Sequence, residues 1–444
     1  MEKTPTPSKI LRDLGNDLIL RRSTPSDADQ LEAFNSRIHG GDEPDPSIGV
    51  WTRDLLSGKH PTFRPDDFLV VENTRSGKII SSSNLISQTW SYAGIAFKVG
   101  RPELIGTEAD YRRRGLVRMQ MEILHAWSAE RGEWVQAITG IPEYYRQFGY
   151  EMTIRLDSGR YVNYTQNKPL PEGEQELYSL RPAKVEEIPV IRECYEDVEK
   201  RNVVTCQRSS EYWEYELTGK SLSSVDRTAV FMIEDSSGRI VGTLGVRGEM
   251  WAGDGVVVSF YGLCPGNSYL MITPAVLRFL WKEGQKRMPE GKTCSRIVLP
   301  FGTHHPIYEV LDPRRVSLIN HYAYYMRVPD VPGFLRLITP VLEQRLAESC
   351  CAGHSGELKV SLYRDGFTMQ LENGKIAGIS RYSPVDWLDG DAFFPGQTFL
   401  HLLFQSRGLT ELNDFYDDCR FNNTGYALLN AMFPCSPSAV WAIG

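Results

Sequence analysis

The clearest pattern of apolar and polar positions lies between residues 104 and 150. It opens with the short apolar run 104–107, typical of a strand, and passes three consecutive arginines that end at Gly115. A second strand is predicted at 134–139, before an aromatic cluster around Tyr145. Between the strands, apolar residues recur at helical spacing up to a cap at Arg131-Gly132; they are Leu116, Met119, Ile123, Leu124 and Trp127. The stretch therefore predicts strand, basic loop, helix, strand and aromatic turn.

The residues before this stretch predict a strand, a helix and a hairpin. Residues 18–21 form an apolar run, and Thr24-Pro25-Ser26-Asp27 supplies an N-cap, a proline at the first helical position and an acid three residues after the cap. A helix is expected to about Ile38, with Leu31, Phe34 and Ile38 facing inward. Residues 68–71 and 78–80 flank a turn at 75–77 and predict a hairpin, and 95–99 adds a strand. The loop 44–61 shows no clear period.

The opening pattern returns near residue 180. Residues 180–188 echo the first strand and helix start, and 231–242 echo the first hairpin. These echoes indicate an internal duplication, with 167–173 as linker. The second copy has Tyr261-Gly262-Leu263-Cys264-Pro265-Gly266-Asn267 where an arginine-glycine loop is expected. We therefore expect a structural half that does not hold a cofactor well.

A third part follows Pro329 and Pro332. Apolar residues from Phe334 to Leu346 mark an amphipathic helix, and 357–379 alternates around Asp365-Gly366 and Asn373-Gly374 turns, which predicts a meander. A length of 444 residues also favours about three domains.

Composition excludes several classes of protein. The net charge is −7, which argues against a dedicated nucleic-acid binder. The N-terminal sequence lacks the apolar core of a signal peptide, and no run approaches the ~20 apolar residues of a membrane span, so a cytoplasmic protein without membrane contacts is expected. The eight cysteines lack zinc-site spacing and indicate neither a metal site nor a disulfide scaffold; buried thiols are expected.

The basic loop has the chemistry of an anion site. A helix that starts at Gly115 exposes backbone N–H groups without intrahelical partners, and the helix dipole adds partial positive charge there. Arg112, Arg113 and Arg114 add full charges, while Gly115 lets the backbone approach an anion closely. A phosphate-binding loop is therefore predicted, although basic runs are more often solvated surface.

The whole stretch resembles motifs A and B of the GNAT acetyltransferase superfamily. More narrowly, Arg112-Arg113-Arg114-Gly115-Leu116 followed by Tyr145-Arg146-Gln147-Phe148-Gly149-Tyr150 is similar to the Eis-like (enhanced intracellular survival) acetyltransferases. The resemblance implies an α+β chain: a disordered or extended 1–16, a catalytic GNAT domain at 17–165, a degenerate GNAT-like domain at 176–328 and a sterol-carrier-protein-like domain at 329–444. Eis-like relatives imply a possible homo-oligomer, a hexamer or a trimer.

The resemblance also implies roles for individual residues. The strand at Ile105, Gly106 and Thr107 would pair with the pantetheine arm of acetyl-CoA, and the N–H groups of Arg113 through Arg118, including Leu116 and Val117, would hold the pyrophosphate. Tyr145 would protonate the leaving thiolate, whereas Tyr144, Phe148 and Tyr150 would be core aromatics. The C-terminal carboxylate of Gly444 would be the base; Glu108, Glu143 and Glu151 are side-chain alternatives. No metal is expected.

The sequence departs from the family at two positions. Ala109 replaces a proline before the arginine loop, and Gly140-Ile141-Pro142-Glu143 replaces a Ser-Glu-Gly-Gly segment, so the family's substrate range is not carried over. The expected function is acetyl transfer from acetyl-CoA to a primary amine of a small molecule or lysine-type acceptor. The alternatives are a CoA-binding pseudo-enzyme and the use of a different acyl-CoA, by transfer or by cleavage.

Overall fold

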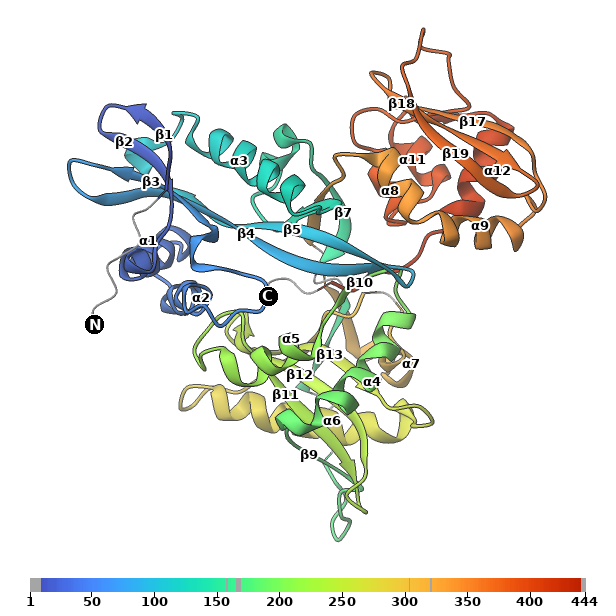
Figure 1. The fold of residues 1–444 in the computed structure, drawn as a ribbon. Helices are drawn as coiled ribbons and strands as arrows, with labels where there is room; N and C mark the ends of the chain where they lie inside the picture. The colour runs from blue at the N-terminus through green and yellow to red at the C-terminus, as the bar shows by residue number, and fades with distance from the viewer. Residues whose placement is uncertain (1–8, 157–158, 165–168, 303, 320–321, 441–444) are drawn as a thin grey trace.

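Three mixed or antiparallel sheets organise the chain, with helices packed against each of them (Figure 1). The structure is a computed structural model that describes residues 9–156, 159–164, 169–302, 304–319 and 322–440. The expected α+β class is confirmed. Within the described residues, no helix is long and apolar enough to cross a membrane.

The first sheet is built on the long hairpin of β4 (Lys78–Tyr92) and β5 (Ile95–Thr107). The strand order is β1 (Ile10–Gly15), β2 (Leu18–Arg22), β3 (Phe68–Asn73), β4, β5, β6 (Val135–Ile138), β16 (Tyr322–Arg327) and β7 (Glu151–Leu156), while β10 (Val204–Gln207) pairs with β4. Part of the N-terminal segment 1–16 is thus a paired strand; residues 1–8 lie outside the described residues.

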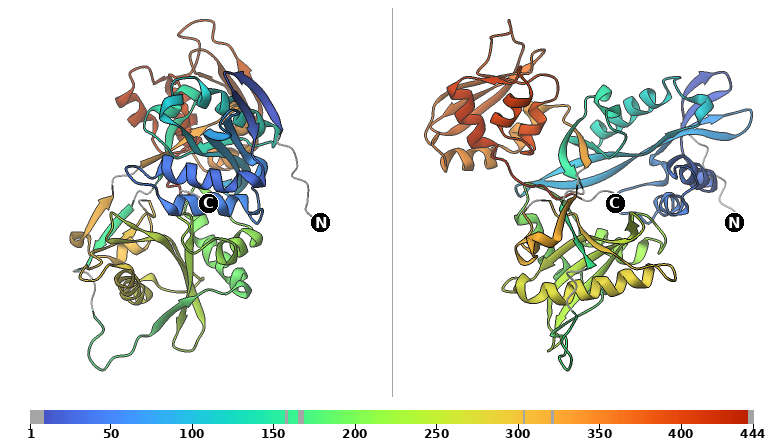
Figure 2. Two further views of the ribbon diagram at one scale, coloured as in Figure 1. Left: turned by 90° about the vertical axis from the view of Figure 1, so that its left-hand side faces the viewer. Right: turned by 180° about the vertical axis from the view of Figure 1, so that it is seen from behind.

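Helices cover both faces of this sheet (Figure 1). One face packs on α3 (Leu116–Glu130), whose predicted apolar positions Leu116, Leu124 and Trp127 are buried. The other packs on α1 (Ala28–His39), which was predicted with its inward Leu31 and Phe34, and on α2 (Pro46–Leu56), which was not. Both views of Figure 2 place the second sheet on the α1 and α2 side.

The second sheet repeats the first and exchanges a strand with it. Its order is β15 (Val316–Ile319), β8 (Gly159–Asn163), β14 (Arg296–Leu299), β13 (Gly255–Leu263), β12 (Ile240–Trp251), β11 (Thr228–Asp235) and β9 (Tyr178–Pro182). Its helices are α4 (Ile188–Lys200), α5 (Ser210–Glu214), the π-helix η7 (Tyr215–Gly219), α6 (Tyr269–Arg287) and α7 (Ile307–Val310). Strand β8, from the predicted range 17–165, lies in this sheet, and β16, from the range 176–328, lies in the first. The two sheets therefore share chain across the predicted boundary.

The cysteine prediction was wrong in part. Cys194 in α4 and Cys264 just after β13 form a disulfide, with 4.6 Å between their Cα atoms. They lie 70 residues apart in the sequence and meet only because α4 packs on β13. Two of the free cysteines, Cys350 and Cys435, are exposed rather than buried.

The third sheet contains the predicted meander of β17 (Gly356–Ser361), β18 (Gly366–Glu372) and β19 (Lys375–Tyr382). The short strands β20 (Ala392–Phe393) and β21 (Arg420–Phe421) extend it, and its helices are α8 (Val331–Leu337), α9 (Thr339–Ala347), α10 (Phe399–Leu403), α11 (Leu409–Phe415) and α12 (Asn423–Met432). The predicted amphipathic helix is split into α8 and α9.

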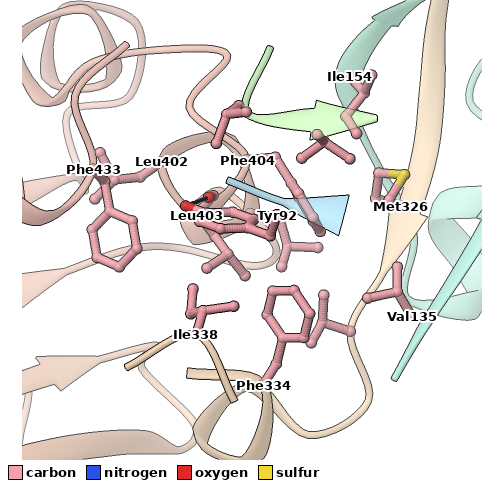
Figure 3. Packing of buried hydrophobic residues seen from close by; sticks show 14 of the residues in the cluster. Tyr92, Val135, Ile154, Met326, Phe334, Ile338, Leu402, Leu403, Phe404 and Phe433 are labelled. Carbon is pink, nitrogen blue, oxygen red and sulfur yellow. Dashed lines mark hydrogen bonds between the residues drawn. The ribbon is translucent and has the colours of Figure 1, made fainter. Parts of the chain in front are cut away.

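A continuous apolar cluster fastens this third unit to the first sheet (Figure 3). The ring of Phe334 in α8 lies 6.1 Å from Tyr92, 5.2 Å from Phe97 and 6.2 Å from Phe404, measured between ring centroids. The Tyr92 hydroxyl also donates to the carbonyl of Leu403 at 2.8 Å. The third unit is thus held to β4 and β5 by packing and by a buried hydrogen bond.

Replacement of Phe334 by alanine should lower the free energy of unfolding, because it removes the packing of α8 against β4 and β5. Phe334 is fully buried, and removing a buried phenyl ring costs about 3–5 kcal/mol in comparable cores. Urea denaturation, monitored by tryptophan fluorescence, should show that the free energy of unfolding falls by this amount. Phe415→Ala is the control, because Phe415 is 69% exposed and its loss should leave stability within about 0.5 kcal/mol.

Candidate active site

Strands β5 and β6 diverge before the predicted acyl-donor segment Ile105–Thr107. Among the described residues, their parallel ladder holds only the pairs Val99 with Val135 and Gly100 with Gln136, although β5 continues to Thr107. On its other side, β5 has an irregularity: Asn84 pairs with Glu103 and Ser82 with Gly106, so two residues intervene on β5 and one on β4. Leu104 at this bulge has a φ of 50°. Bulges of this kind re-aim backbone and side chains beside active sites.

The predicted Ile105, Gly106 and Thr107 lie on this diverging segment. Gly106 is required there, because a Cβ at this position would overlap the side chain of Ile38 in α1. The backbone edge of β5 that β6 leaves unpaired can accept an extended chain of amide groups, such as the pantetheine arm. The structure therefore places these three residues where such an arm could lie.

The arginine loop runs directly into the start of α3. Arg113 and Gly115 have φ values of 62° and 77°, which turn successive backbone N–H groups toward one side. Leu116, Val117 and Arg118 are the first three residues of α3, so their N–H groups have no intrahelical acceptor. This geometry is typical of a backbone anion site at a helix N-terminus.

The arginine side chains support the loop and remain at the surface. Arg112 Nε donates to the Thr107 carbonyl at 3.2 Å, which ties the loop to the end of β5. Arg114 donates to the Asp110 carbonyl at 2.9 Å and lies 4.8 Å from the centre of the Tyr111 ring. Arg118 donates to Gln147 Oε1 at 2.7 Å and thereby connects α3 to the aromatic turn.

Tyr145 lies in that turn, the short helix η4 (Tyr144–Phe148), and is 5% exposed. Its ring centroid is 5.2 Å from Tyr144 and 5.6 Å from Tyr325 of β16. A Cβ at Gly140 would overlap the Tyr145 ring, so the departure from the family pattern at 140–143 packs directly against this tyrosine. Tyr150 is fully buried and bonded to His125 at 2.8 Å, as expected of a core aromatic.

The three predicted glutamates are each held by an arginine. Glu108 pairs with Arg37, and both Glu143 and Glu151 pair with Arg146, Glu151 at 2.8 Å. All three predicted carboxylates are thus engaged in ion pairs at the edge of the site.

Glu103 is a candidate that the sequence reasoning missed. It is 6% exposed and precedes the bulge residue Leu104. Burial raises the pKa of Glu103 to about 7, against the opposing effect of its partner Arg101. The signal that could have revealed it is a charged pair, Arg101 and Glu103, inside the buried part of β5 at 99–104.

Gly444 lies outside the described residues, which end at Val440, and the described tail is docked at Pro437–Ala439. Val203 N donates to the Pro437 carbonyl at 2.8 Å, and Ala439 N donates to the Val204 carbonyl at 2.9 Å. Ala439 thus runs parallel to β10, which is itself antiparallel to β4. The tail therefore runs in the direction that leads from Tyr92 toward Asn84 on β4.

Comparison with known proteins identifies the first part of this architecture. Residues 20–153 match the family model of an acetyltransferase (GNAT) domain. This part of the chain is a GNAT acetyltransferase domain. It contains the bulge, the arginine loop, α3 and Tyr145, so the expected acyltransferase class is confirmed for it. GNAT domains use acetyl-CoA as co-substrate.

No curated protein sequence matches the chain at a significant level.

Solved structures resemble the chain over nearly its whole length. A probable N-acyltransferase of unknown function from Enterococcus faecalis V583 is 13% identical, with a TM-score of 0.67 and coverage of 96% of this chain and 100% of that chain. Eis1 from Mycobacterium abscessus is 15% identical, with a TM-score of 0.62 and coverage of 95% and 99%. A GCN5-related N-acetyltransferase from Anabaena variabilis is 14% identical, with a TM-score of 0.61 and coverage of 96% and 98%. At these identities the similarity concerns the fold, which extends through the second and third sheets.

Proposed function

We propose that this protein transfers an acetyl group from acetyl-CoA to a primary amine of a small-molecule or lysine-type acceptor by direct attack. The observation that carries the proposal is one arrangement in the GNAT domain: β5 and β6 diverge, the arginine loop runs into α3 at Gly115, and Tyr145 shares an apolar cluster with Leu116 and Ile105. The arm of the donor lies along Ile105–Thr107, and its diphosphate lies on the amides of Arg113–Arg118. The third unit, a five-stranded sheet with helices, is proposed to be sterol-carrier-protein-like.

The acceptor ammonium gives a first proton to a base, and its nitrogen then forms a bond to the acyl carbon. Collapse of the tetrahedral intermediate breaks the carbon–sulfur bond, and Tyr145 donates its phenolic proton to the departing thiolate. The nitrogen loses its second proton to solvent as the amide forms, and the Tyr145 phenolate regains a proton from solvent. Backbone N–H groups at the bulge would stabilise the oxyanion.

Two groups are proposed as the base. The carboxylate of Gly444 follows from the Eis-like resemblance, and the docked tail at Pro437–Ala439 supports it by its direction. Glu103 is supported by its burial, its raised pKa and its position beside the bulge. The two make different predictions, which are developed in the Discussion.

Release of free thiol from acetyl-CoA tests the proposal directly. Purified protein is incubated with acetyl-CoA and a panel of amines, and thiol is measured with a colorimetric reagent. Release that depends on an amine supports transfer, and release without amine indicates cleavage. Binding of acetyl-CoA without thiol release, together with an inert Tyr145→Phe substitution, would instead support a CoA-binding pseudo-enzyme. Acetyl-CoA and longer acyl-CoAs are compared in the same assay.

Substitution of Gly115 by alanine should weaken acetyl-CoA binding about tenfold. A side chain at a φ of 77° costs roughly 1–2 kcal/mol, and the new methyl group would stand beside the amides that hold the diphosphate. Isothermal titration with CoA measures the change in Kd. Gly132→Ala is a matched control, because Gly132 has a φ of 67° and equally open space but lies at the other end of α3. Equal losses for both variants would contradict the assigned diphosphate site.

A further inference from the structure

A row of buried polar residues lies on the face of β4 and β5 that is turned toward α1 and the second sheet. A Cβ added at Gly106 would meet Phe34 and Ile38 of α1, so this position faces α1. Ser82 pairs with Gly106 across the two strands and therefore faces the same side, and Asn84, two residues later on β4, does so too. Glu103 is directly opposite Asn84. The row therefore starts at the bulge, beside the segment Ile105–Thr107 along which the donor arm is proposed to lie.

Two members of this row have unused hydrogen-bonding groups. Ser82 and Asn84 are both fully buried. Within the described residues, neither Ser82 Oγ nor the amide nitrogen or oxygen of Asn84 has a hydrogen-bond partner. Buried polar groups are almost always paired, and each unpaired one costs about 1–3 kcal/mol. Three such atoms on adjacent positions of one face indicate a place for a polar ligand.

A loop of the second unit closes the row. Val225 packs into the apolar cluster that contains Ile86 and Leu104, and Ser221 donates to Asp54 of α2 at 2.6 Å. Ser224 Oγ is buried and, among the described residues, also unpaired. Asp226, at the end of this loop, contributes negative charge next to Glu103. We call residues 221–226 the closing loop.

The closing loop is held rigidly by buried charges. Lys220 Nζ lies 2.7 Å from both Glu216 Oε2 and Asp226 Oδ2, and Arg208 lies 3.1 Å from Glu216. Glu216 belongs to the π-helix η7, a type of helix found frequently at functional sites. The loop is therefore a fixed wall that ends at the buried carboxylate of Asp226.

A small cavity reaches this wall from the second unit. It has a volume of about 100 Å³, and its lining includes Val225, Asp226 and Thr228 together with the tail residues Ser438–Val440, but not Ser82, Asn84 or Glu103. The cavity therefore borders the closing loop and not the buried row itself.

We infer that Ser82, Asn84 and Glu103, closed by residues 221–226, form the acceptor site, and that the acceptor is a small cationic amine with a neighbouring hydroxyl or amide group. The ammonium would lie between the carboxylates of Glu103 and Asp226. The additional polar group would use the Asn84 amide and Ser82 hydroxyl, which an alkylamine would leave unpaired. This inference rests on the proposed acetyl transfer and assigns the substrate class of the same site.

Three amines test the assignment: 2-aminoethanol, propylamine of the same chain length, and a lysine-containing hexapeptide. Thiol release should show a KM for 2-aminoethanol at least tenfold below that for propylamine, because a site built to hydrogen-bond a hydroxyl rejects the analogue that lacks it. The peptide should be the poorest acceptor. Equal KM values for all three would overturn the inference.

Asn84→Leu should abolish this preference without loss of stability. Leucine has a similar size and removes two unpaired polar atoms, so the melting temperature should stay the same or rise while the KM ratio falls toward one. A lower melting temperature with an unchanged KM ratio would assign Asn84 a structural role and overturn the inference.

Ser82 and Ser83 form a matched pair. Both are fully buried, and the hydroxyl of each is unpaired among the described residues, but they face opposite sides of the sheet. Ser82→Ala should raise the KM for 2-aminoethanol severalfold, whereas Ser83→Ala should not. Equal effects would count against the site.

A binding measurement separates this inference from the proposed reaction. Titration of 2-aminoethanol into the protein–CoA complex is followed by NMR for the native chain and for Asn84→Leu. Binding that is lost in the variant, in the absence of any thiol release, would retain the amine site and overturn acetyl transfer. Absence of binding to the native chain would overturn the site.

Discussion

Replacement of Tyr145 by phenylalanine should lower kcat by about 10²–10³-fold while the Kd for acetyl-CoA stays within a factor of two. General acid catalysis by a positioned side chain contributes about 10²–10⁴-fold, and phenylalanine removes only the proton donor. The ring packing against Tyr144 and Tyr325 should survive, because no carbon atom is lost. Steady-state thiol release gives kcat, and calorimetric titration gives the affinity.

Tyr144→Phe is the control for this experiment. Tyr144 is the neighbour of Tyr145 in η4, and burial raises the pKa of its phenol, yet the proposed reaction assigns it no proton. We expect kcat within a factor of two. A large loss from Tyr144→Phe with little effect of Tyr145→Phe would transfer the acid role to the neighbouring ring. Full activity in both variants would mean that the thiolate leaves without a protein acid.

Local sequence patterns predicted the elements that carry the anion site. The helical spacing of Leu116, Leu124 and Trp127 reports burial on one face of α3, and Gly115 reports the left-handed turn that precedes it. Both are properties of a few consecutive residues. The hairpins and the third-sheet meander were predicted for the same reason, since alternation and turn residues act over short distances.

Contacts between distant segments could not be predicted in this way. The insertion of β16 between β6 and β7 depends on which strand edges are open after the first unit has formed. The sequence of β16 does not show which strands it will pair with. Helix α2 was obscured by its surrounding prolines, although Pro46 is at its start and the Asp45 side chain caps it by accepting from Ser47 N at 2.8 Å. Glu103 is significant because burial raises its pKa, and a segment as distant in the sequence as Asp226 adds to that effect.

Glu103→Gln should lower kcat/KM at pH 7 by about 10²–10³-fold if Glu103 is the base. The carboxylate form accepts the proton, so the activity of the native chain should rise as the pH increases through about 7, the pKa to which burial raises Glu103. The residual activity of the glutamine variant should not show this rise near pH 7, which we call the pH step. Glu108→Gln, which removes a partly exposed carboxylate paired with Arg37, should leave both the rate and the step unchanged.

Stability must be measured in the same variant, because Arg101 is fully buried and pairs with Glu103. The folded-state pKa of Glu103 is above the value of 4.5 of a free side chain, so the folded chain binds this proton more tightly than the unfolded chain. The protonated Glu103 side chain therefore contributes to the free energy of unfolding below about pH 4.5, and this contribution is lost as the pH rises toward 7. Thermal unfolding across this range shows whether the glutamine variant remains folded under the assay conditions.

Removal of Gly444 distinguishes the two proposed bases. The deletion moves the terminal carboxylate back by one residue to Ile443. If the Gly444 carboxylate is the base, this displacement should sharply lower thiol release, and Glu103→Gln should retain the pH step. If Glu103 is the base, the truncated chain should keep the step near pH 7, because the buried carboxyl beside Asn84 is unchanged. Equal losses in both variants, with the step absent from each, would indicate one proton path in which the two carboxylates act in sequence. If both variants keep the native rate of thiol release, neither Gly444 nor Glu103 is the base, and another group must accept the proton.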